Sequence, residues 1–485
     1  MKLLRQYSSL VIKLVKIRFT TSAINKNIEC RRTIFYTFRD WGGIYLKFLQ
    51  ILAGMSKFME GWGGPREMEV FSQAPCEPLD LGQQIDLSKF AEVSSTPVAA
   101  GSFAQVYRGR LKTGEEVAIK VLRPSIQKSL RRDLKTLSHL CKFFTHFLPQ
   151  TLVDYNEAYT ACANMFLTET DYHREMANQE YFAKLYHDHP RVVIPQVYSE
   201  LCSSTVIVQD FIAGPTLSDV MSQATSDKPA SQIAYELTGS DLWEQVIVAG
   251  GEALYMAMCA DYVYGDPHPG NIILLPGNRI ALIDFGVIAN RPRSHRAFYD
   301  WVKSYYDILD NRGSFQELLE TTVVCFCPDI ALAMRRCNFD NADLLRILSE
   351  AISDKLSHEL DGDTTFVQSF KDGHLIEVFI KVVNTQVLKV KIDMINFELI
   401  KAMQAFLGSV TILDNSEGRH GFSGLMYKSM NYALARSQAH GVPQDNVTAT
   451  CLSLTDSYEL LVRTISSLAD NDEYVFDLIS ERIFA

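Results

Sequence analysis

The sequence predicts an α+β fold of two lobes, the first built on a sheet and the second mostly helical. Three observations lead to this class. Short apolar runs separated by tight turns fill residues 97–122. Two more apolar runs, Ile272–Leu275 and 280–283, are joined by a Pro-Gly-Asn turn, which is typical of a β-hairpin. From residue 290 onward the apolar residues recur at helical spacing.

The hairpin carries polar residues at both of its open ends. Asp266 and Asn271 precede its first strand, and Asp284 begins an Asp-Phe-Gly that follows its second. A hairpin brings these ends together, and the protein-kinase catalytic loop uses the same residue types at the same spacing. Carboxylate and amide oxygens suit Mg²⁺. The stretch therefore predicts a protein-kinase-like fold, against the simpler interpretation that these side chains shape a turn and cap a strand. His268, flanked by prolines, is interpreted as a loop-shaping residue.

Charge is distributed unevenly along the 485 residues. Residues 1–40 carry nine Lys/Arg against two acids, whereas the other 445 residues carry 38 basic and 55 acidic side chains. The acidic body argues against nucleic acid as a partner. The basic beginning suits an anionic membrane surface.

Two classes are disfavoured by the remaining composition. The ten cysteines are scattered, with no C-x-x-C, so neither a disulfide framework nor a zinc site is expected. No apolar run reaches the ~18–20 residues that a membrane-spanning helix needs.

The first 60 residues predict two helical segments. Residues 1–28 contain no acid and mix basic with apolar residues. Such a segment could be a helix on a membrane surface, a mitochondrial presequence, or a solvated helix packed on the body. Residues 40–60 have a helical pattern that places Lys47 and Gln50, three positions apart, on one face.

Residues 97–122 predict the phosphate-binding part of the first lobe. The small residues Ala99-Ala100-Gly101-Ser102 would let backbone N–H groups approach phosphates. Strands are expected at 105–110 and 116–122, and the second contains the V-A-I-K that ends in Lys120. This lysine needs an acid on a following helix, for which Glu169, Asp171 and Glu175 are the candidates.

The rest of the chain is expected to link and complete the lobes. Strands are predicted at 191–197 and 205–212, with a hinge at 213–215 and an adenine site at Gln209, Asp210 and Phe211. A helix over 240–262 would lead into the catalytic loop. Further helices are expected over 294–310, 341–357 and 375–413.

Taken together, these motifs resemble the UbiB/AarF family of atypical kinase-like proteins, which are associated with coenzyme Q and other isoprenoid lipids. The alanine-bearing loop, the E-x-D at Glu169 and Asp171, and the D-P-H-P-G-N at 266–271 match the family. Its K-x-G-Q helix matches 47–50, except that Leu49 stands where the family has glycine. The resemblance covers roughly residues 40–290.

The resemblance implies a role for each matching residue. Lys120 would contact the α- and β-phosphates of ATP and pair with Glu175. Asn271 and Asp284 would bind Mg²⁺, and Asp266 would be the catalytic base. The N-terminal helix would fold toward the E-x-D as a regulatory latch, although Leu49 would push that contact apart; the latch residues are Lys47, Gln50, Glu169 and Asp171.

The expected organisation has four parts. Residues 1–39 form the basic amphipathic or targeting segment, and 40–90 the helical extension. Residues 91–213 form the kinase-like first lobe, and 214–485 the helical second lobe with the catalytic loop. After Gly286 the next 30 residues contain no A-P-E, which argues against conventional protein phosphorylation.

The predicted function is that of an ATP- and Mg²⁺-dependent atypical kinase or ATPase in ubiquinone or isoprenoid-lipid metabolism. Its expected partners are an isoprenoid or quinone lipid, an anionic membrane surface and proteins of quinone biosynthesis. It would lie on the cytoplasmic face of a bacterial membrane, or in mitochondria if the N-terminus is a presequence. Two alternatives stay open: a non-catalytic nucleotide-binding scaffold, and a small-molecule phosphotransferase of the aminoglycoside or choline type.

Overall fold

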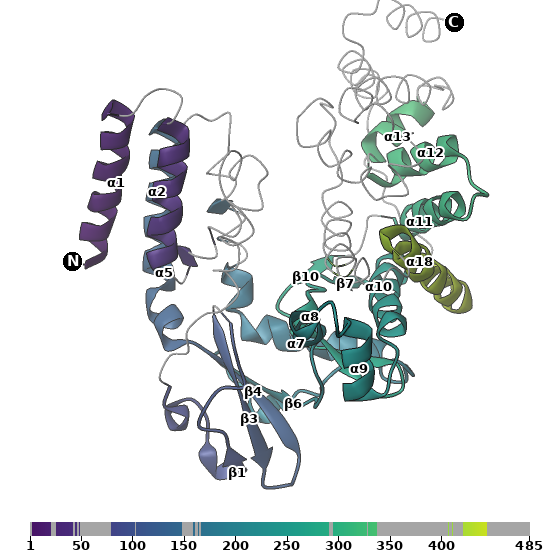
Figure 1. Ribbon diagram of the computed structural model, residues 1–485, viewed down its shortest axis with the longest axis horizontal. Helices are drawn as coiled ribbons and strands as arrows, with labels where there is room; N and C mark the ends of the chain where they lie inside the picture. Colours follow the sequence, from purple (N-terminus) through teal and green to yellow (C-terminus); the bar gives the residue numbers. More distant parts are fainter. Residues whose placement is uncertain are drawn as a thin grey trace, which may run out of the picture. The chain divides into compact units, whose positions relative to one another are not determined.

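Two units of the chain each contain their own β-structure (Figure 1). The first unit comprises Met1–Leu185 and Ile194–Ile212, and the second Tyr186–Val193 and Ala213–Ala485. The computed structural model describes residues 2–20, 26–41, 44–45, 48, 79–101, 103–147, 159–160, 163, 166–290, 294–326, 328–336, 406, 410 and 421–443.

The first unit is built on an antiparallel sheet with the strand order β1-β3-β4-β6, and β2 pairs with β3 at one end. Its strands are β1 Phe90–Val93, β2 Ala99–Ala100, β3 Ala104–Leu111, β4 Glu116–Leu122 and β6 Val206–Asp210. The long strands predicted at 105–110 and 116–122 are thus confirmed to within a residue.

Side chains of this sheet alternate between two apolar clusters, one on each face. On β4, Val117, Ile119 and Val121 belong to one cluster, together with Val206 and Val208 of β6. The intervening residues Leu122 and Ile207 belong to the other cluster. Lys120 therefore stands on the same face as Leu122.

That second cluster lies among the helices of the first unit, which are α1 Lys2–Thr20, α2 Lys26–Trp41, α5 Pro124–Phe147 and α7 Tyr172–Leu185. Helix α5 begins at a proline, whose fixed φ and missing N–H suit the first helical position. Helices α1 and α2 pack side by side and bury Leu10, Leu14 and Phe38 (Figure 1). Short 3₁₀ turns span Leu81–Gln83, Leu87–Lys89 and Ser199–Leu201.

The second unit contains two small sheets. One has the order β5-β9-β8, with β5 parallel to β9, and the other pairs β7 with β10. The strands are β5 Val192–Val193, β7 Tyr262–Tyr264, β8 Ile272–Leu275, β9 Arg279–Leu282 and β10 Ile288–Asn290. The predicted hairpin is confirmed as β8 and β9, with Gly277 and Asn278 at positive φ in its turn.

Helices make up most of the described remainder of this unit. They are α8 Leu217–Gln223, α9 Ala230–Thr238, α10 Leu242–Cys259, α11 His295–Leu309, α12 Phe315–Phe326, α13 Pro328–Arg336 and α18 Gly421–His440, and a 3₁₀ turn spans Pro269–Asn271. Helix α10 is buried on every side, as its almost entirely apolar sequence requires. The helix predicted over 294–310 is confirmed as α11, which Ser294 caps.

Two predictions of secondary structure were wrong in extent. The strand expected at 191–197 is only Val192–Val193, and it pairs with β9 of the second unit. Pro195 explains this, because it has no N–H to donate to a ladder. The helix expected over 240–262 ends at Cys259, and Tyr262 already belongs to β7.

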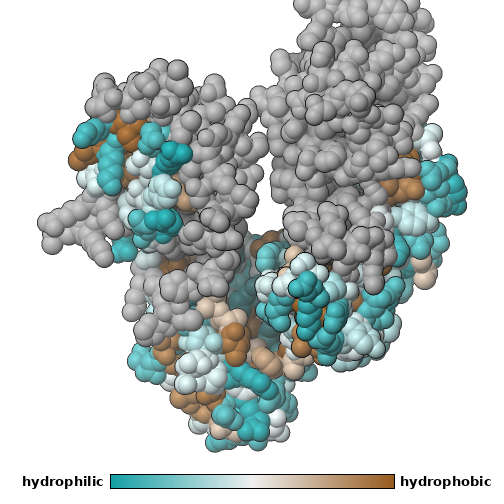
Figure 2. Space-filling model, in the orientation of Figure 1, coloured by the Kyte–Doolittle hydropathy of each residue, from teal (hydrophilic) through white to brown (hydrophobic). Residues whose placement is uncertain are grey.

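Several predictions fall outside the described residues: Lys47, Leu49, Gln50, Ser102, the helix at 341–357 and most of 375–413. Within the described part, no helix is long and apolar enough to cross a membrane. On the face shown in Figure 2, hydrophilic and hydrophobic residues are interspersed over the described N-terminal surface.

Candidate active site

Lys120 and Glu175 form an ion pair in the first unit. Nζ of Lys120 lies 2.6 Å from Oε1 of Glu175, and these side chains expose only 17% and 4% of their surface. The ammonium also lies 5.7 Å from the centroid of the Tyr172 ring. Lys120 reaches these groups because β-strand alternation turns it to the face of the sheet that carries the helical cluster.

The other two acids of this region have different positions. Asp171 precedes α7, and its Oδ1 accepts a hydrogen bond from the Arg174 backbone N–H at 3.1 Å, so it caps the helix. Glu169 ends the helical residues 166–169 and is partly exposed. Among the three candidates, Glu175 is thus the acid that the structure pairs with Lys120. The proposed Lys47 contact lies outside the described residues.

The alanine-bearing loop is the tip of the hairpin formed by β2 and β3. Ala99 pairs with Val106 and Ala100 with Gln105, and the Gly101 N–H donates to the Ala104 carbonyl at 2.9 Å. A Cβ added at Gly101 would meet its nearest atom only at 3.9 Å. A Cβ at this position would therefore make only an ordinary van der Waals contact.

The predicted adenine segment has its own contacts within the first unit. The backbone N–H of Asp210 donates to the Gln196 carbonyl at 3.0 Å, and that of Phe211 to the Glu116 carbonyl at 2.9 Å. The Asp210 carboxylate accepts from the Tyr198 hydroxyl at 2.9 Å. Burial, followed by this hydrogen bond, raises the pKa of Tyr198 to about 12. Gln209 lies on β6 opposite Ala118.

Asp266 and Asn271 are joined directly in the second unit. The Asn271 Nδ2 donates to Oδ2 of Asp266 at 3.0 Å and lies 3.3 Å from its backbone carbonyl. His268 shapes the loop between them, because its Nδ1 accepts from the Gly270 N–H at 3.0 Å. Because the Nδ2 group of Asn271 donates to Asp266, the amide oxygen of Asn271 is the atom that can bind a metal or another group.

The hairpin returns Asp284 to the same end. The Ile283 N–H donates to the Asn271 carbonyl at 3.0 Å, so Asp284 follows directly after this pair. Strand β7 pairs with β10, which puts Asp266 and Asp284 on short connections between the same two sheets. The Tyr264 hydroxyl adds a hydrogen bond to the Ile283 carbonyl at 2.7 Å, and its ring packs on buried Phe285.

Asp284 has an unusual backbone conformation, with φ at 69°. Non-glycine residues are uncommon in this left-handed region, and such conformations gather at functional sites. Its carboxylate accepts from the Gly286 N–H at 3.2 Å. The local fold thus specifies the direction of this side chain.

The oxygen atoms of Asp266, Asn271 and Asp284 suit a magnesium ion that also binds a phosphate. Two carboxylates and one amide oxygen are hard ligands, and Mg²⁺ in nucleotide sites takes only one or two protein carboxylates. Across the described ranges, no group of three or more His, Cys, Asp or Glu residues gathers as a metal site. With two carboxylates and one amide oxygen, Asp266, Asn271 and Asp284 suit a metal that also binds a phosphate.

Three buried residues that the sequence analysis did not name make contacts near the site or within the second unit. Arg123 donates to the Gly101 carbonyl, and Phe103 is buried beside the same loop. Glu252, fully buried on α10, accepts hydrogen bonds from Tyr186 and Tyr432. The available signal was the residue type: an aromatic residue in a small-residue loop, and an acid inside an apolar helix.

The sheet with its lysine–glutamate pair and the hairpin with its D-F-G define a kinase-like α+β fold, so the predicted class is confirmed. Comparison with known proteins makes the class specific. Residues 76–311 match the ABC1 atypical kinase-like domain. This match confirms the resemblance to the UbiB/AarF proteins for this part of the chain.

Three curated relatives illustrate this similarity. The protein ACTIVITY OF BC1 COMPLEX KINASE 1, chloroplastic, of Arabidopsis thaliana is 38% identical over 212 residues, covering 43% of this chain and 29% of the relative. The probable protein kinase UbiB of Cronobacter sakazakii is 31% identical over 52% of this chain and 46% of its own. The AarF domain-containing protein kinase 1 of Xenopus laevis is 28% identical over 53% and 49%. The aligned part thus spans less than half of each relative.

Proposed function

We propose that this chain is an atypical kinase or ATPase of the UbiB type that binds ATP with Mg²⁺. The observation that carries the proposal is the buried Lys120–Glu175 ion pair, 2.6 Å long, in a chain that also holds the Asp266–Asn271 pair beside Asp284. In the kinase fold the first pair serves the nucleotide phosphates, and the second set serves the metal and the attacking group.

The nucleotide would be held by groups of several kinds. Lys120 would contact the α- and β-phosphates, while backbone N–H groups of the alanine-bearing loop would approach the phosphates closely. Adenine would meet the segment Gln209, Asp210 and Phe211. Because the amides of Asp210 and Phe211 already donate within the first unit, adenine recognition there would depend on carbonyl oxygens.

Asn271 and Asp284 would hold Mg²⁺, which neutralises phosphate charge when bound. Asp266 would accept the proton of the attacking hydroxyl or water. Its hydrogen bond from Asn271 holds the carboxylate in one orientation, so the base is positioned before the nucleotide arrives. Glu175 would keep the Lys120 ammonium in place, since an opposite charge nearby favours the ionised form of both.

The acceptor in this proposal is a lipid of the isoprenoid or quinone class at a membrane surface. Support comes from the UbiB resemblance and from α1, where Lys13 and Lys16 are exposed while Leu10 and Leu14 are buried. A basic helix of this kind is attracted to anionic lipids. Lys47 and Gln50, with Glu169 and Asp171, would regulate access. Both predicted locations, a bacterial membrane face and the mitochondrion, stay proposals.

Magnesium-dependent ATP turnover by the purified protein tests the proposal, measured with and without anionic liposomes. Asp284→Asn should abolish turnover, whereas Asp300→Asn, at a half-buried position of α11 that pairs with Arg296, should leave it unchanged. Turnover that rises on liposomes supports a membrane-activated enzyme. ATP binding without phosphate release would instead favour the scaffold, and turnover stimulated by small soluble alcohols but not by liposomes would favour the small-molecule phosphotransferase.

A further inference from the structure

Arg123 binds one carbonyl group of the alanine-bearing loop and the carbonyl group of the residue that follows the loop. Its Nη2 donates to the Gly101 carbonyl at 2.6 Å, and its backbone N–H donates to the Phe103 carbonyl at 2.8 Å. Because peptide groups are planar and trans, fixing a carbonyl also fixes the direction of the N–H that follows it. Arg123 lies three residues after Lys120 and is 4% exposed. The loop is therefore anchored to the residue that directly follows β4, the strand that carries Lys120.

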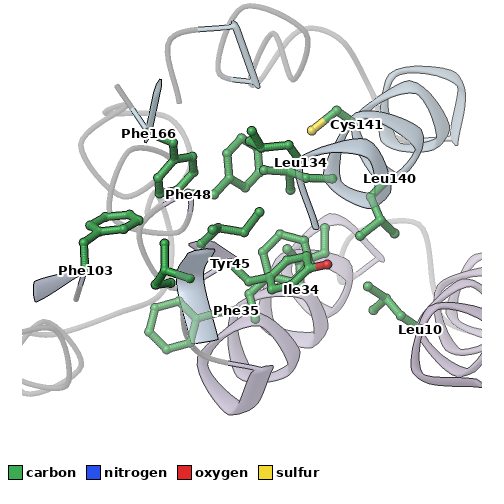
Figure 3. Packing of buried hydrophobic residues seen from close by; sticks show 14 of the residues in the cluster. Leu10, Ile34, Phe35, Tyr45, Phe48, Phe103, Leu134, Leu140, Cys141 and Phe166 are labelled. Atoms are coloured by element: carbon green, nitrogen blue, oxygen red, sulfur yellow. The ribbon is translucent and has the colours of Figure 1, made fainter. Parts of the chain in front are cut away.

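The Phe103 side chain anchors the loop a second time, on a different structure. It is 5% exposed and belongs to the apolar cluster formed by α1, α2 and α5. Its ring centroid lies 5.1 Å from that of Phe166, in an edge-on arrangement. Figure 3 shows Phe103 and Phe166 pointing into the cluster together with Phe48 and Phe35 of the N-terminal part.

Ala99 and Gly101 are exposed, but Phe103, which follows the loop directly, shares a core with the N-terminal helices. Phe166 lies one helical turn before Glu169, so the same contact also reaches the segment that carries the E-x-D. A loop whose bound conformation is already formed loses less conformational entropy on binding its ligand.

We propose that Phe103 and Arg123 are positioning residues that hold the alanine-bearing loop in the conformation that binds nucleotide phosphates. The phosphate part of this inference rests on the proposed function. Phe103 supplies the attachment to the N-terminal core, and Arg123 supplies the attachment to the end of β4. Neither residue touches the reacting atoms.

The test uses Phe103→Ala in the full chain beside a matched control. Phe90→Ala removes the same ring from the opposite apolar cluster of the same sheet, and Phe90 is 6% exposed against 5% for Phe103. Both substitutions leave a cavity, so both should lower the melting temperature to a similar degree. Phe103→Leu keeps an apolar side chain and should restore most of the wild-type behaviour.

Hydrogen–deuterium exchange of the segment 97–107 without nucleotide is the first measurement. It should be about tenfold faster in Phe103→Ala and in Arg123→Gln than in Phe90→Ala, because only the first two release the loop. The second measurement is the dissociation constant of a fluorescent ATP analogue with Mg²⁺. It should rise about tenfold in the same two variants and stay near the wild-type value in the control.

The two measurements separate the inference from the function on which it rests. If the loop of Phe103→Ala exchanges no faster than that of Phe90→Ala, the positioning role is overturned whatever the nucleotide does. If the loop exchanges faster and the wild-type protein binds no nucleotide, the anchoring stands and the proposed function fails. If loop exchange rises and nucleotide affinity is unchanged, the loop is anchored but does not serve the phosphates, which overturns the inference.

Discussion

Lys120 and Glu175 are 55 residues apart in the chain and mostly removed from water. A buried charge is stabilised mainly by its partner. If the partner is removed, water cannot take its place. The exposed pair of Arg110 and Glu92 is different, since more than half of each side chain is hydrated. These two pairs belong to the same unit and offer a direct comparison.

We expect Glu175→Gln to lower the free energy of unfolding by about 1–3 kcal/mol, because the buried Lys120 loses its charged acceptor. In a double-mutant cycle with Lys120→Met, the coupling energy should be about 0.5–3 kcal/mol. Urea unfolding measures both. The control Glu92→Gln should change stability by less than about 1 kcal/mol. If Glu175→Gln and Glu92→Gln lowered the free energy of unfolding equally, burial would not be what makes the Lys120–Glu175 pair stabilising.

At the residue scale, the sequence predicted Lys120 from V-A-I-K but left three acids as its partner. The resemblance pointed to Glu175, and the structure pairs this acid with Lys120. The sequence could not show which acid pairs with Lys120, because all three lie within seven positions. The choice depends on the residue at which α7 begins. Asp171 caps that helix, which leaves Glu175 inside its first turn.

Among the elements, α10 and α18 are joined around a buried carboxylate. Glu252 of α10 accepts from the hydroxyls of Tyr186 and Tyr432 at 2.9 and 2.8 Å. His189 Nε2 lies 3.1 Å and Arg436 Nε 3.0 Å from its Oε1. The His189 Nδ1 accepts hydrogen bonds from the backbone N–H groups of residues 191 and 192. The proton of this ring is therefore on Nε2, which faces Glu252.

Glu252→Gln should destabilise the protein by about 3–5 kcal/mol, because Arg436 would remain in a site shielded from water without its counter-charge. Thermal unfolding followed by circular dichroism measures the effect. Tyr432→Phe removes a single hydrogen bond from the same network and should cost only about 1 kcal/mol. A glutamine variant as stable as the wild type would show that the carboxylate charge is dispensable.

Elements with a strong local signal were predicted well. The hairpin β8–β9 follows from its Pro-Gly-Asn turn, and α11 follows from its apolar spacing. The short strand β5 was overpredicted because apolar β-branched residues on both sides of Pro195 resemble one continuous strand. Only the sheet partner, β9 of the same unit, shows where the pairing stops.

On the scale of the whole molecule, the proposed function draws on both units. Lys120 and Glu175 belong to the first, and Asp266, Asn271 and Asp284 to the second. The chain passes between the units after Leu185, Val193 and Ile212. Under the proposed function, altering either set of residues should lower the affinity for nucleotide.

Addition of Mg²⁺ and ATP at about 100 times the dissociation constant should stabilise the wild-type protein by about 2.7 kcal/mol. Differential scanning fluorimetry would detect this as a rise of several degrees in the melting temperature. Lys120→Met in the first unit and Asp284→Asn in the second should each remove most of that rise. A full rise in either variant would mean that its unit does not contribute to the nucleotide site.

The sequence by itself determined the kinase-like class, because the hairpin, the V-A-I-K strand and the D-P-H-P-G-N loop depend on local turn chemistry and short-range alternation. Tertiary structure alone decided which partners the buried groups have. Phe103, Arg123 and Glu252 carry no local motif, and their contacts come from residues as distant as 180 positions. Burial forces a polar group to find a partner, but only the packing of distant elements determines which partner lies within reach.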